Sequence, residues 1–271
     1  MRSTAAALIG ATALLLGACG EDASDDPSTG STGSSDPGTS SPSPPERRTG
    51  TLTLSTGESV AYWCAGEGSP GVLLEAGTDS GGTDAYPAAF VDPLIAKTTV
   101  CTYDRPGTGL SDPAPRHRRT MRDLCAVQDE VVTKLSLPNP AFLVGQSGGG
   151  NLAIGCAARH PESIAGLVTI DSYHDDPQDL QAEGFTWTDN PEFVDYVDYS
   201  EELDKLKMPI GDFPVLIVSA TQADPGGDKN QRYWLRLSPS SRQVVIEGPH
   251  DLHETAPEQV VTEILKDLPA G

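Results

Sequence analysis

The feature that most constrains this chain is a regular alternation between short apolar segments and segments with the spacing of a helix. The apolar segments, each bounded by turn residues, lie at residues 71–75, 98–103, 141–146, 164–170, 214–219 and 243–247. The helical segments lie at residues 86–97, 120–135, 148–159, 228–237 and 257–268. Apolar runs of this length are typical of strands that are buried on both faces. The alternation therefore predicts an α/β fold with a mostly parallel sheet and helices on both faces of that sheet.

Two departures from the alternation define the rest of the folded region. Residues 51–55 and 59–64 flank a Thr-Gly-Glu turn and are predicted to form an opening hairpin, which brings the sheet to about eight strands. Residues 172–212 are acidic and rich in Asp, Glu and Tyr, and here the alternation stops. We expect this segment to be a small lid inserted over one edge of the site. Residues 51–271 are therefore predicted to form one domain.

The first fifty residues indicate export and a flexible connection. Arg2 precedes an apolar run at residues 5–16 that is too short to cross a bilayer as a permanent helix. The following Leu-Gly-Ala-Cys resembles the lipobox of bacterial lipoproteins, which implies removal of residues 1–18 and lipidation of Cys19. The protein would then lie outside the cytoplasm, anchored to the cell membrane by lipid alone. The alternative is an ordinary secretory signal with an incidental cysteine. Residues 19–50 are polar and rich in Ser, Pro and Gly, so we expect a disordered tether.

The charge balance argues against one class of partner. The chain has 18 Lys and Arg against 39 Asp and Glu, a formal charge of −21. Such a chain repels phosphate backbones and anionic bilayer surfaces, so nucleic acid is not an expected partner. The sequence has no P-loop pattern and no dinucleotide-binding pattern, and no Cys and His cluster has zinc-ligand spacing. We therefore expect no cofactor and no metal.

One motif carries a recognisable chemistry. Gly145-Gln146-Ser147-Gly148-Gly149 matches G-x-S-x-G and stands between a predicted strand and a predicted helix. A sharp turn at such a corner would expose the Ser147 hydroxyl near a helix N-terminus, and the glycines leave room for the helix to cross close to the strand. A glycine-rich turn could instead cradle a phosphate, but the known phosphate-binding patterns are absent. Ser147 is therefore predicted to be a nucleophile.

A serine nucleophile needs a base, an acid that orients the base, and donors for the developing oxyanion. His250 follows the last predicted strand and is the expected base. Asp171 ends one predicted strand and Asp224 follows the next, and both are candidates for the acid. The backbone N–H groups of Gly148 and Thr78 are the expected oxyanion-hole donors, because they follow the nucleophile and an earlier strand.

Glu75 is an unexpected residue at the end of an apolar strand. A buried carboxylate needs partners that compensate for the loss of water, and Arg105 is the partner that we expect.

These segments together resemble the α/β-hydrolase fold superfamily. The resemblance is carried by Leu74-Glu75-Ala76-Gly77, by Tyr-Asp-Arg-Pro-Gly-Thr-Gly-Leu-Ser-Asp at residues 103–112, by the G-x-S-x-G corner and by the final His250, and it covers residues 51–271. The chain looks like the branch in which Leu-Glu-x-Gly precedes the oxyanion residue. The resemblance implies the chain order serine, acid, histidine. Asp224 stands about one residue later after its strand than is usual, which slightly favours Asp171.

The function implied by this resemblance is hydrolysis of a small-molecule substrate, an ester or in some members an amide. We expect a lipid-anchored serine hydrolase that cleaves carboxylic esters through an acyl-enzyme on Ser147. A secreted aminopeptidase or amidase on the same fold is an alternative, and it could use acidic residues 183–204 to anchor a substrate amino terminus. A binding module without catalysis is a further alternative, against which the intact serine and histidine argue.

The folded region contains Cys64, Cys101, Cys125 and Cys156. In the superfamily the second and fourth strands are neighbours, which implies a Cys64–Cys101 pair. Cys125 and Cys156 lie on consecutive helices that are expected to pack on the same side of the sheet. Two disulfides would suit an oxidising compartment. The alternative is four buried thiols.

Overall fold

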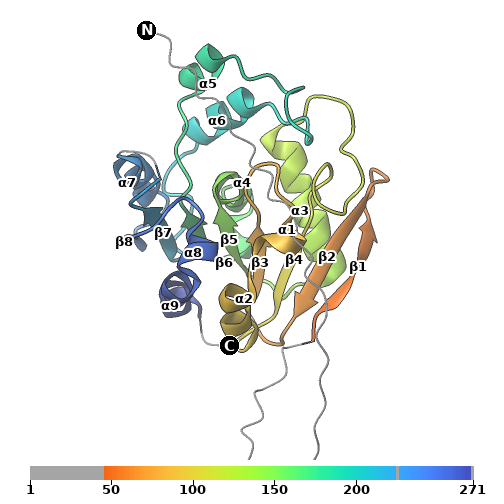
Figure 1. Ribbon diagram of the computed structural model, residues 1–271, viewed down its shortest axis with the longest axis vertical. Helices are drawn as coiled ribbons and strands as arrows, with labels where there is room; N and C mark the ends of the chain where they lie inside the picture. Colours follow the sequence, from red (N-terminus) through yellow and green to blue (C-terminus); the bar gives the residue numbers. More distant parts are fainter. Residues whose placement is uncertain (1–45, 224–225, 270–271) are drawn as a thin grey trace, which may run out of the picture. The chain divides into compact units, whose positions relative to one another are not determined.

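The computed structural model describes residues 46–223 and 226–269, which contain a sheet of eight strands. The strands are β1 (Arg48–Thr53), β2 (Ser59–Ala65), β3 (Gly71–Glu75), β4 (Val100–Tyr103), β5 (Ala141–Gln146), β6 (Ile164–Ile170), β7 (Val215–Ala220) and β8 (Ser241–Ile246). Their spatial order is β1-β2-β4-β3-β5-β6-β7-β8 (Figure 1). Strand β2 is antiparallel to β1 and β4, and all other pairs are parallel. The prediction of a mostly parallel sheet of about eight strands is confirmed.

The order of the strands reverses between β3 and β5. From β3 the chain continues to β4 on one side, and from β5 it continues through β6, β7 and β8 on the other side. Strands β3 and β5 pair from Gly71 with Ala141 to Glu75 with Gly145, so their carboxyl ends are level. Open α/β sheets bind ligands outside the carboxyl ends of the strands at such a switch point. This topology brings the loop after β3 close to the turn after β5.

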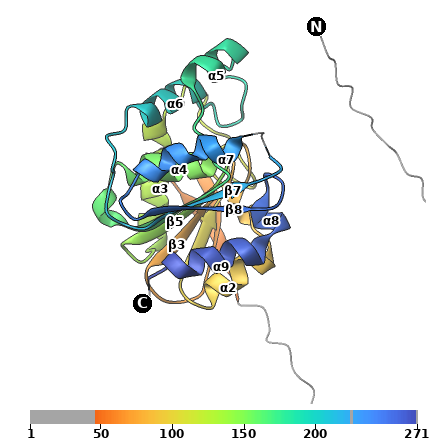
Figure 2. The ribbon, with the colours of Figure 1, turned by 90° about the vertical axis from the view of Figure 1, so that its left-hand side faces the viewer.

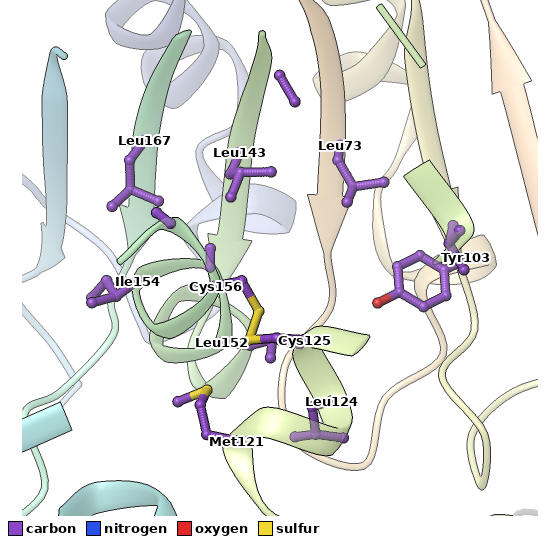
Figure 3. Packing of buried hydrophobic residues seen from close by; sticks show 14 of the residues in the cluster. Leu73, Tyr103, Met121, Leu124, Cys125, Leu143, Leu152, Ile154, Cys156 and Leu167 are labelled. Atoms are coloured by element: carbon purple, nitrogen blue, oxygen red, sulfur yellow. A yellow bond between two sulfur atoms is a disulfide. The ribbon is translucent and has the colours of Figure 1, made fainter. Parts of the chain in front are cut away.

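Helices cover both faces of the sheet (Figure 2). Helices α2 (Ala88–Ile95), α8 (Leu252–Thr255) and α9 (Pro257–Asp267) contribute to one hydrophobic cluster, and α3 (Met121–Leu135) and α4 (Gly148–Ala157) contribute to the other. Successive side chains of a strand point to opposite faces. Leu73 and Leu143 therefore join the cluster of α3 and α4 (Figure 3), whereas Val72 and Phe142 join the cluster of α2 and α9. The two-sided burial explains why these strands are continuous apolar runs.

Two disulfides join the four cysteines in the pairs that the resemblance implies. Cys64 on β2 and Cys101 on β4 are register partners, so their disulfide crosses the antiparallel strand pair. Cys125 on α3 is bonded to Cys156 on α4 within the hydrophobic cluster between these helices (Figure 3). Such a cross-link stabilises a domain by about 2–4 kcal/mol, chiefly by restricting the unfolded chain.

The predicted insertion forms two helices between β6 and β7, α5 (Pro177–Glu183) and α6 (Tyr196–Asp204) (Figure 1). Two of the acidic residues of the insertion are N-caps of these helices. Asp176 and Asp195 accept hydrogen bonds from backbone N–H groups at the N-termini of α5 and α6, respectively. Helix α6 packs against α3 and α4. A parallel bridge between Arg119 and Val194 also joins the insertion to the rest of the domain.

Some element boundaries differ from those predicted. Strand β1 begins at Arg48, within the residues predicted as tether, because Arg48 pairs with Cys64 through its backbone and its exposed side chain leaves no apolar signal. The predicted helix at residues 86–97 is shorter than expected, since Pro87 is the N-cap of α2 and the helix ends at Ile95. The short helices are α1 (Gly82–Ala85), α7 (Gly227–Asn230) and the 3-10 helices η1 (Pro161–Ser163) and η2 (Gln231–Arg236).

The predicted signal peptide, Cys19 and most of the predicted tether lie outside the described residues, as does Asp224. Within the described ranges, no helix has both the length and the apolar character needed to span a bilayer.

Candidate active site

Ser147 lies at a sharp turn between β5 and α4. Its backbone has φ 52° and ψ −128°, a conformation that costs energy for a residue with a side chain. A Cβ on Gly145 would lie 2.3 Å from the Gly149 carbonyl oxygen, and a Cβ on Gly149 would lie 2.3 Å from the Ala76 carbonyl oxygen. The turn is therefore possible only with glycine at both positions. The G-x-S-x-G pattern is a steric requirement of this corner.

Asp171 follows β6, the strand next to β5, and its side chain is completely buried. Oδ1 accepts hydrogen bonds from the Ala220 N–H at 2.9 Å and from Nε2 of Gln231 at 2.6 Å. Oδ2 lies 2.7 Å from Nδ1 of His250 and accepts a longer bond of 3.3 Å from the Tyr173 hydroxyl. The structure thus brings Asp171 and His250 into direct contact across the edge formed by β6, β7 and β8.

The electrostatics of this pair set the protonation state of both groups. Burial by itself raises the pKa of Asp171, but the hydrogen bonds from His250, the Ala220 N–H and Gln231 outweigh it and lower that pKa below its ordinary value. Because Asp171 is therefore ionised, Nδ1 of His250 donates the bond between them. The same hydrogen bond raises the pKa of His250, against a smaller opposing effect of burial. The neutral imidazole then has its lone pair on Nε2, where it can accept a proton.

A backbone hydrogen bond joins Ser147 to the residue that precedes Asp171. The Ser147 N–H donates to the carbonyl of Ile170, the residue directly before Asp171, at 2.8 Å. Within the described part of the chain, no hydrogen bond joins the Ser147 hydroxyl to His250. Catalytic hydrogen bonds are often long in unliganded enzymes and tighten when substrate binds.

Thr78 and Gly148 lie side by side, as expected for the ends of β3 and β5. A Cβ on Gly148 would lie 3.4 Å from the Thr78 nitrogen. Neither the N–H of Thr78 nor that of Gly148 donates a hydrogen bond to any residue that the structure describes. The Gly148 N–H also belongs to the first turn of α4, where the helix dipole favours a negative charge. Two adjacent free N–H groups can stabilise an oxyanion.

A cavity of about 200 Å³ opens beside these N–H groups. It lies between Thr78 and Gly148 on one side and the inserted helices on the other, and its walls are mostly apolar. The insertion contributes Leu180, Phe185, Tyr196, Tyr199 and Leu203 to the lining. The Tyr199 hydroxyl donates to the Gly148 carbonyl oxygen at 3.2 Å, so the insertion contacts the nucleophile turn directly. The predicted position of the insertion over one edge of the site agrees with this contact.

Several features of the site carry no sequence signal. Gln231 is fully buried in η2 and donates to Asp171, yet in the sequence it is one of several consecutive polar residues and lies sixty positions from Asp171. His253 is also buried, and its ring packs edge-on against Tyr86 at 5.3 Å between centroids. Among the described residues, no group of three or more His, Cys, Asp and Glu side chains could hold a metal ion.

Curated relatives match less than half of this chain. The protein named "Putative carbamate hydrolase RutD" of Caulobacter vibrioides is 31% identical over 125 residues, which is 45% of this chain and 45% of the relative. Its counterpart of the same name from Caulobacter segnis is 31% identical over 126 residues, covering 45% and 46% of the two chains. The matched region thus spans about half the length of these relatives.

Solved structures match nearly the whole described domain. The enol-lactonase from Burkholderia xenovorans superposes with a TM-score of 0.68 and 17% identity, covering 81% of this chain and 99% of the other. A thermophilic esterase from Thermogutta terrifontis superposes with a TM-score of 0.62 and 20% identity, covering 82% and 97%. At this identity the likeness concerns the fold alone.

The sequence profile described as "alpha/beta hydrolase fold" matches residues 72–234, more than half of the 271 residues. The match includes the loop after β3, the turn at Ser147, Asp171 and the insertion. On this evidence the chain belongs to the alpha/beta hydrolase fold family.

Proposed function

We propose that this protein is a serine hydrolase that cleaves carboxylic esters through an acyl-enzyme on Ser147. The observation that carries the proposal is the 2.7 Å hydrogen bond between Asp171 and His250 beside a serine in a strained turn. A buried carboxylate that holds Nδ1–H leaves Nε2 free to act as a base. The ester-cleaving activity of a structural neighbour, named as an esterase, is compatible with this assignment.

In the proposed reaction the Ser147 Oγ attacks the ester carbonyl carbon while its proton passes to Nε2 of His250. The carbonyl electron pair moves to the oxygen, which accepts hydrogen bonds from the N–H groups of Thr78 and Gly148. The C–O bond to the alcohol then breaks, and His250 returns the proton to the leaving oxygen. Water repeats the sequence on the acyl-enzyme and releases the carboxylic acid and free Ser147.

The cavity supports a substrate with one compact apolar arm. Its volume of about 200 Å³ somewhat exceeds the roughly 150 Å³ of an engineered apolar cavity that binds benzene. Aromatic walls from Tyr196, Tyr199 and Phe185 favour an acyl or aryl group of similar size. We therefore propose esters of short or medium-length acids, rather than long-chain lipids, as the substrate class.

The direct test compares p-nitrophenyl butyrate hydrolysis by the wild-type protein and by Ser147→Ala, together with labelling by a fluorophosphonate probe. The expected result is turnover and labelling that both depend on Ser147. Labelling of another residue, or hydrolysis unchanged in Ser147→Ala, would contradict the proposal.

Cleavage of C–N bonds on the same fold is the alternative function, and the name of the Caulobacter relatives makes a carbamate a specific candidate. The acidic segment at residues 183–204 would favour substrates with a free amino terminus if the protein were an aminopeptidase. The measurement compares p-nitrophenyl esters with aminoacyl p-nitroanilides and a carbamate at equal concentration. A higher kcat/KM for an anilide or the carbamate than for the ester would replace ester cleavage as the proposed activity.

We also propose that the protein is exported and carries lipid on Cys19, which leaves the hydrolase domain outside the cytoplasm. The proposal rests on the signal-like sequence that ends in Leu-Gly-Ala-Cys. Metabolic labelling with a palmitate analogue and membrane fractionation should give a labelled, membrane-bound protein that becomes unlabelled and soluble in Cys19→Ser. Labelling that persists in Cys19→Ser would contradict the anchor.

A further inference from the structure

Arg105 is a buried cation that the proposed reaction does not use. It follows β4 and is only 4% exposed. The sequence predicts Glu75 as its partner, and Nη1 lies 3.6 Å from Oε2 of Glu75. A closer partner comes from the insertion, because Nε and Nη2 donate to the two carboxylate oxygens of Glu192 at 2.8 and 2.9 Å. Arg105 thus forms a two-pronged ion pair with the insertion.

The remaining donors of Arg105 hold the loop after β3. Nη1 donates to the Ala76 carbonyl oxygen at 2.8 Å, and Nη2 donates to the Gly77 carbonyl oxygen at 2.7 Å. Because a peptide unit is planar and trans, the Thr78 N–H points in the direction opposite to the Gly77 C=O. A guanidinium that fixes this carbonyl therefore fixes the direction of the proposed oxyanion donor.

The charge of Arg105 is compensated mainly by the insertion. Burial lowers the pKa of the guanidinium, but Glu192, and then Glu75, raise it well above its ordinary range. Glu75 is a weaker counter-ion, because its own burial raises its pKa and its Oε1 accepts a 2.8 Å hydrogen bond from Gln128. A buried cation without its partner is strongly destabilising, so the loop contacts of Arg105 depend on Glu192.

We propose that Arg105 is a positioning residue that orients the oxyanion loop, and that Glu192 of the insertion holds Arg105 in the orientation this requires. The inference rests on the proposed function, since it concerns the oxyanion hole of that reaction. The insertion then has two roles, because it lines the substrate cavity and also determines whether the Thr78 N–H is aligned. The ion pair between Arg105 and Glu192 thus couples the insertion to the alignment of the Thr78 N–H.

A second buried arginine provides a matched control. Arg119 is 2% exposed and donates to the Glu192 backbone carbonyl at 3.3 Å and to the Pro106 carbonyl at 3.4 Å. It touches the same segment of the insertion but not the carbonyl oxygens of Ala76 or Gly77. Lysine at either position keeps the charge and loses the planar fork of donors. The two substitutions therefore separate the specific contacts of Arg105 with the loop from the general effect of replacing a buried arginine beside the insertion.

The experiment measures kcat and KM for p-nitrophenyl butyrate and inhibition by an aryl trifluoromethyl ketone in Arg105→Lys, Arg119→Lys and Glu192→Gln. Removal of one oxyanion donor costs about 10²–10³ in kcat. Loosening of that donor should lower kcat about 10- to 100-fold in Arg105→Lys and Glu192→Gln, with KM changed by less than about threefold. The inhibition constant of the ketone, which mimics the tetrahedral adduct, should rise in parallel. Arg119→Lys should change kcat by less than about threefold.

Hydrogen exchange of the peptide that contains residues 76–80 supplies a readout independent of activity. We expect faster exchange in Arg105→Lys and Glu192→Gln than in the wild type or Arg119→Lys, at unchanged circular dichroism. Equal losses of kcat in the two lysine variants, or wild-type exchange in both Arg105→Lys and Glu192→Gln, would overturn the proposal. If Arg105→Lys does not fold, Glu192→Gln decides by the same criteria. A wild-type protein without Ser147-dependent hydrolysis would refute the proposed function, and the exchange data would still decide the role of Arg105.

Discussion

Replacement of Asp171 by Asn isolates the charge of the proposed triad acid from its shape. The backbone of Asp171 has φ 48°, a left-handed conformation that asparagine tolerates better than most residues. The amide also has nearly the size of the carboxylate. The variant should therefore fold, and any loss of activity should come from the altered hydrogen bonds.

The hydrogen bonds around Asp171 determine which way the new amide must point. The Ala220 N–H can only donate, and the Gln231 amide is oriented by its Oε1, which accepts a 2.7 Å bond from the Ser219 hydroxyl. Both groups therefore require an oxygen where Oδ1 stands, which turns the new NH₂ group toward His250. Nδ1 of His250 must then accept a hydrogen bond and lose its proton to Nε2. In this tautomer Nε2 cannot take the proton of Ser147.

The expected effect is a loss of kcat of about 10⁴-fold, the size that the same substitution produces in Ser-His-Asp triads. It corresponds to about 5 kcal/mol of transition-state stabilisation. The assay is hydrolysis of p-nitrophenyl butyrate, with circular dichroism as the test of folding. Asp224→Asn, at the other candidate acid, is the matched control and should keep kcat within about twofold of the wild type. An Asp171→Asn variant that retains more than about a tenth of the activity would refute the reasoning.

Three further results are expected. The kcat/KM of the wild-type protein should fall as the pH decreases through the raised pKa of His250, because the protonated imidazole cannot act as a base. The inflection of the pH profile should lie above the ordinary value of 6.5 and should move lower in Asp171→Asn. A wild-type inflection below 6.5 would contradict the assignment of His250 as the base. Leu203→Trp should fill the cavity and lower kcat/KM for p-nitrophenyl hexanoate by about tenfold or more, while kcat/KM for p-nitrophenyl acetate should change by less than about threefold. Equal effects on both esters would show that the acyl group of the substrate binds outside this cavity. The double variant Cys125→Ser/Cys156→Ser removes a cross-link between residues 31 positions apart. Urea titrations should show a free energy of unfolding that is lower by about 3–4 kcal/mol than that of the wild type. An unchanged unfolding midpoint and slope would be inconsistent with the disulfide.

Local patterns in the sequence were sufficient to predict the fold. Apolar runs long enough for strands alternate with helical spacing, and the sheet forms where those runs were expected. The turn at Ser147 was predictable for the same reason, because only glycine at positions 145 and 149 allows the close backbone contacts at that corner. The errors concern boundaries such as the start of β1, where backbone pairing leaves no mark on the side chains.

The partners of the candidate site depend on contacts between residues far apart in the chain. Two aspartates remained equal or nearly equal candidates in the sequence, and the contact of Asp171 with His250 exists only because β6 and β8 lie on either side of β7. Gln231 was not identifiable, since it stands in the polar run at residues 228–232, and nothing in that run distinguishes the one side chain that is buried and hydrogen-bonded.

The sequence by itself determined the order of strands and helices, the serine corner and the set of candidate residues, because each depends on periodicity and sterics within a few neighbouring residues. Only the tertiary structure decided which carboxylate contacts His250 and how the insertion encloses the cavity. It also decided how the hydrogen-bond donors of Arg105 are shared between Glu192 and the loop after β3. These features depend on the direction of hydrogen bonds and on burial, and both are set when distant segments pack together.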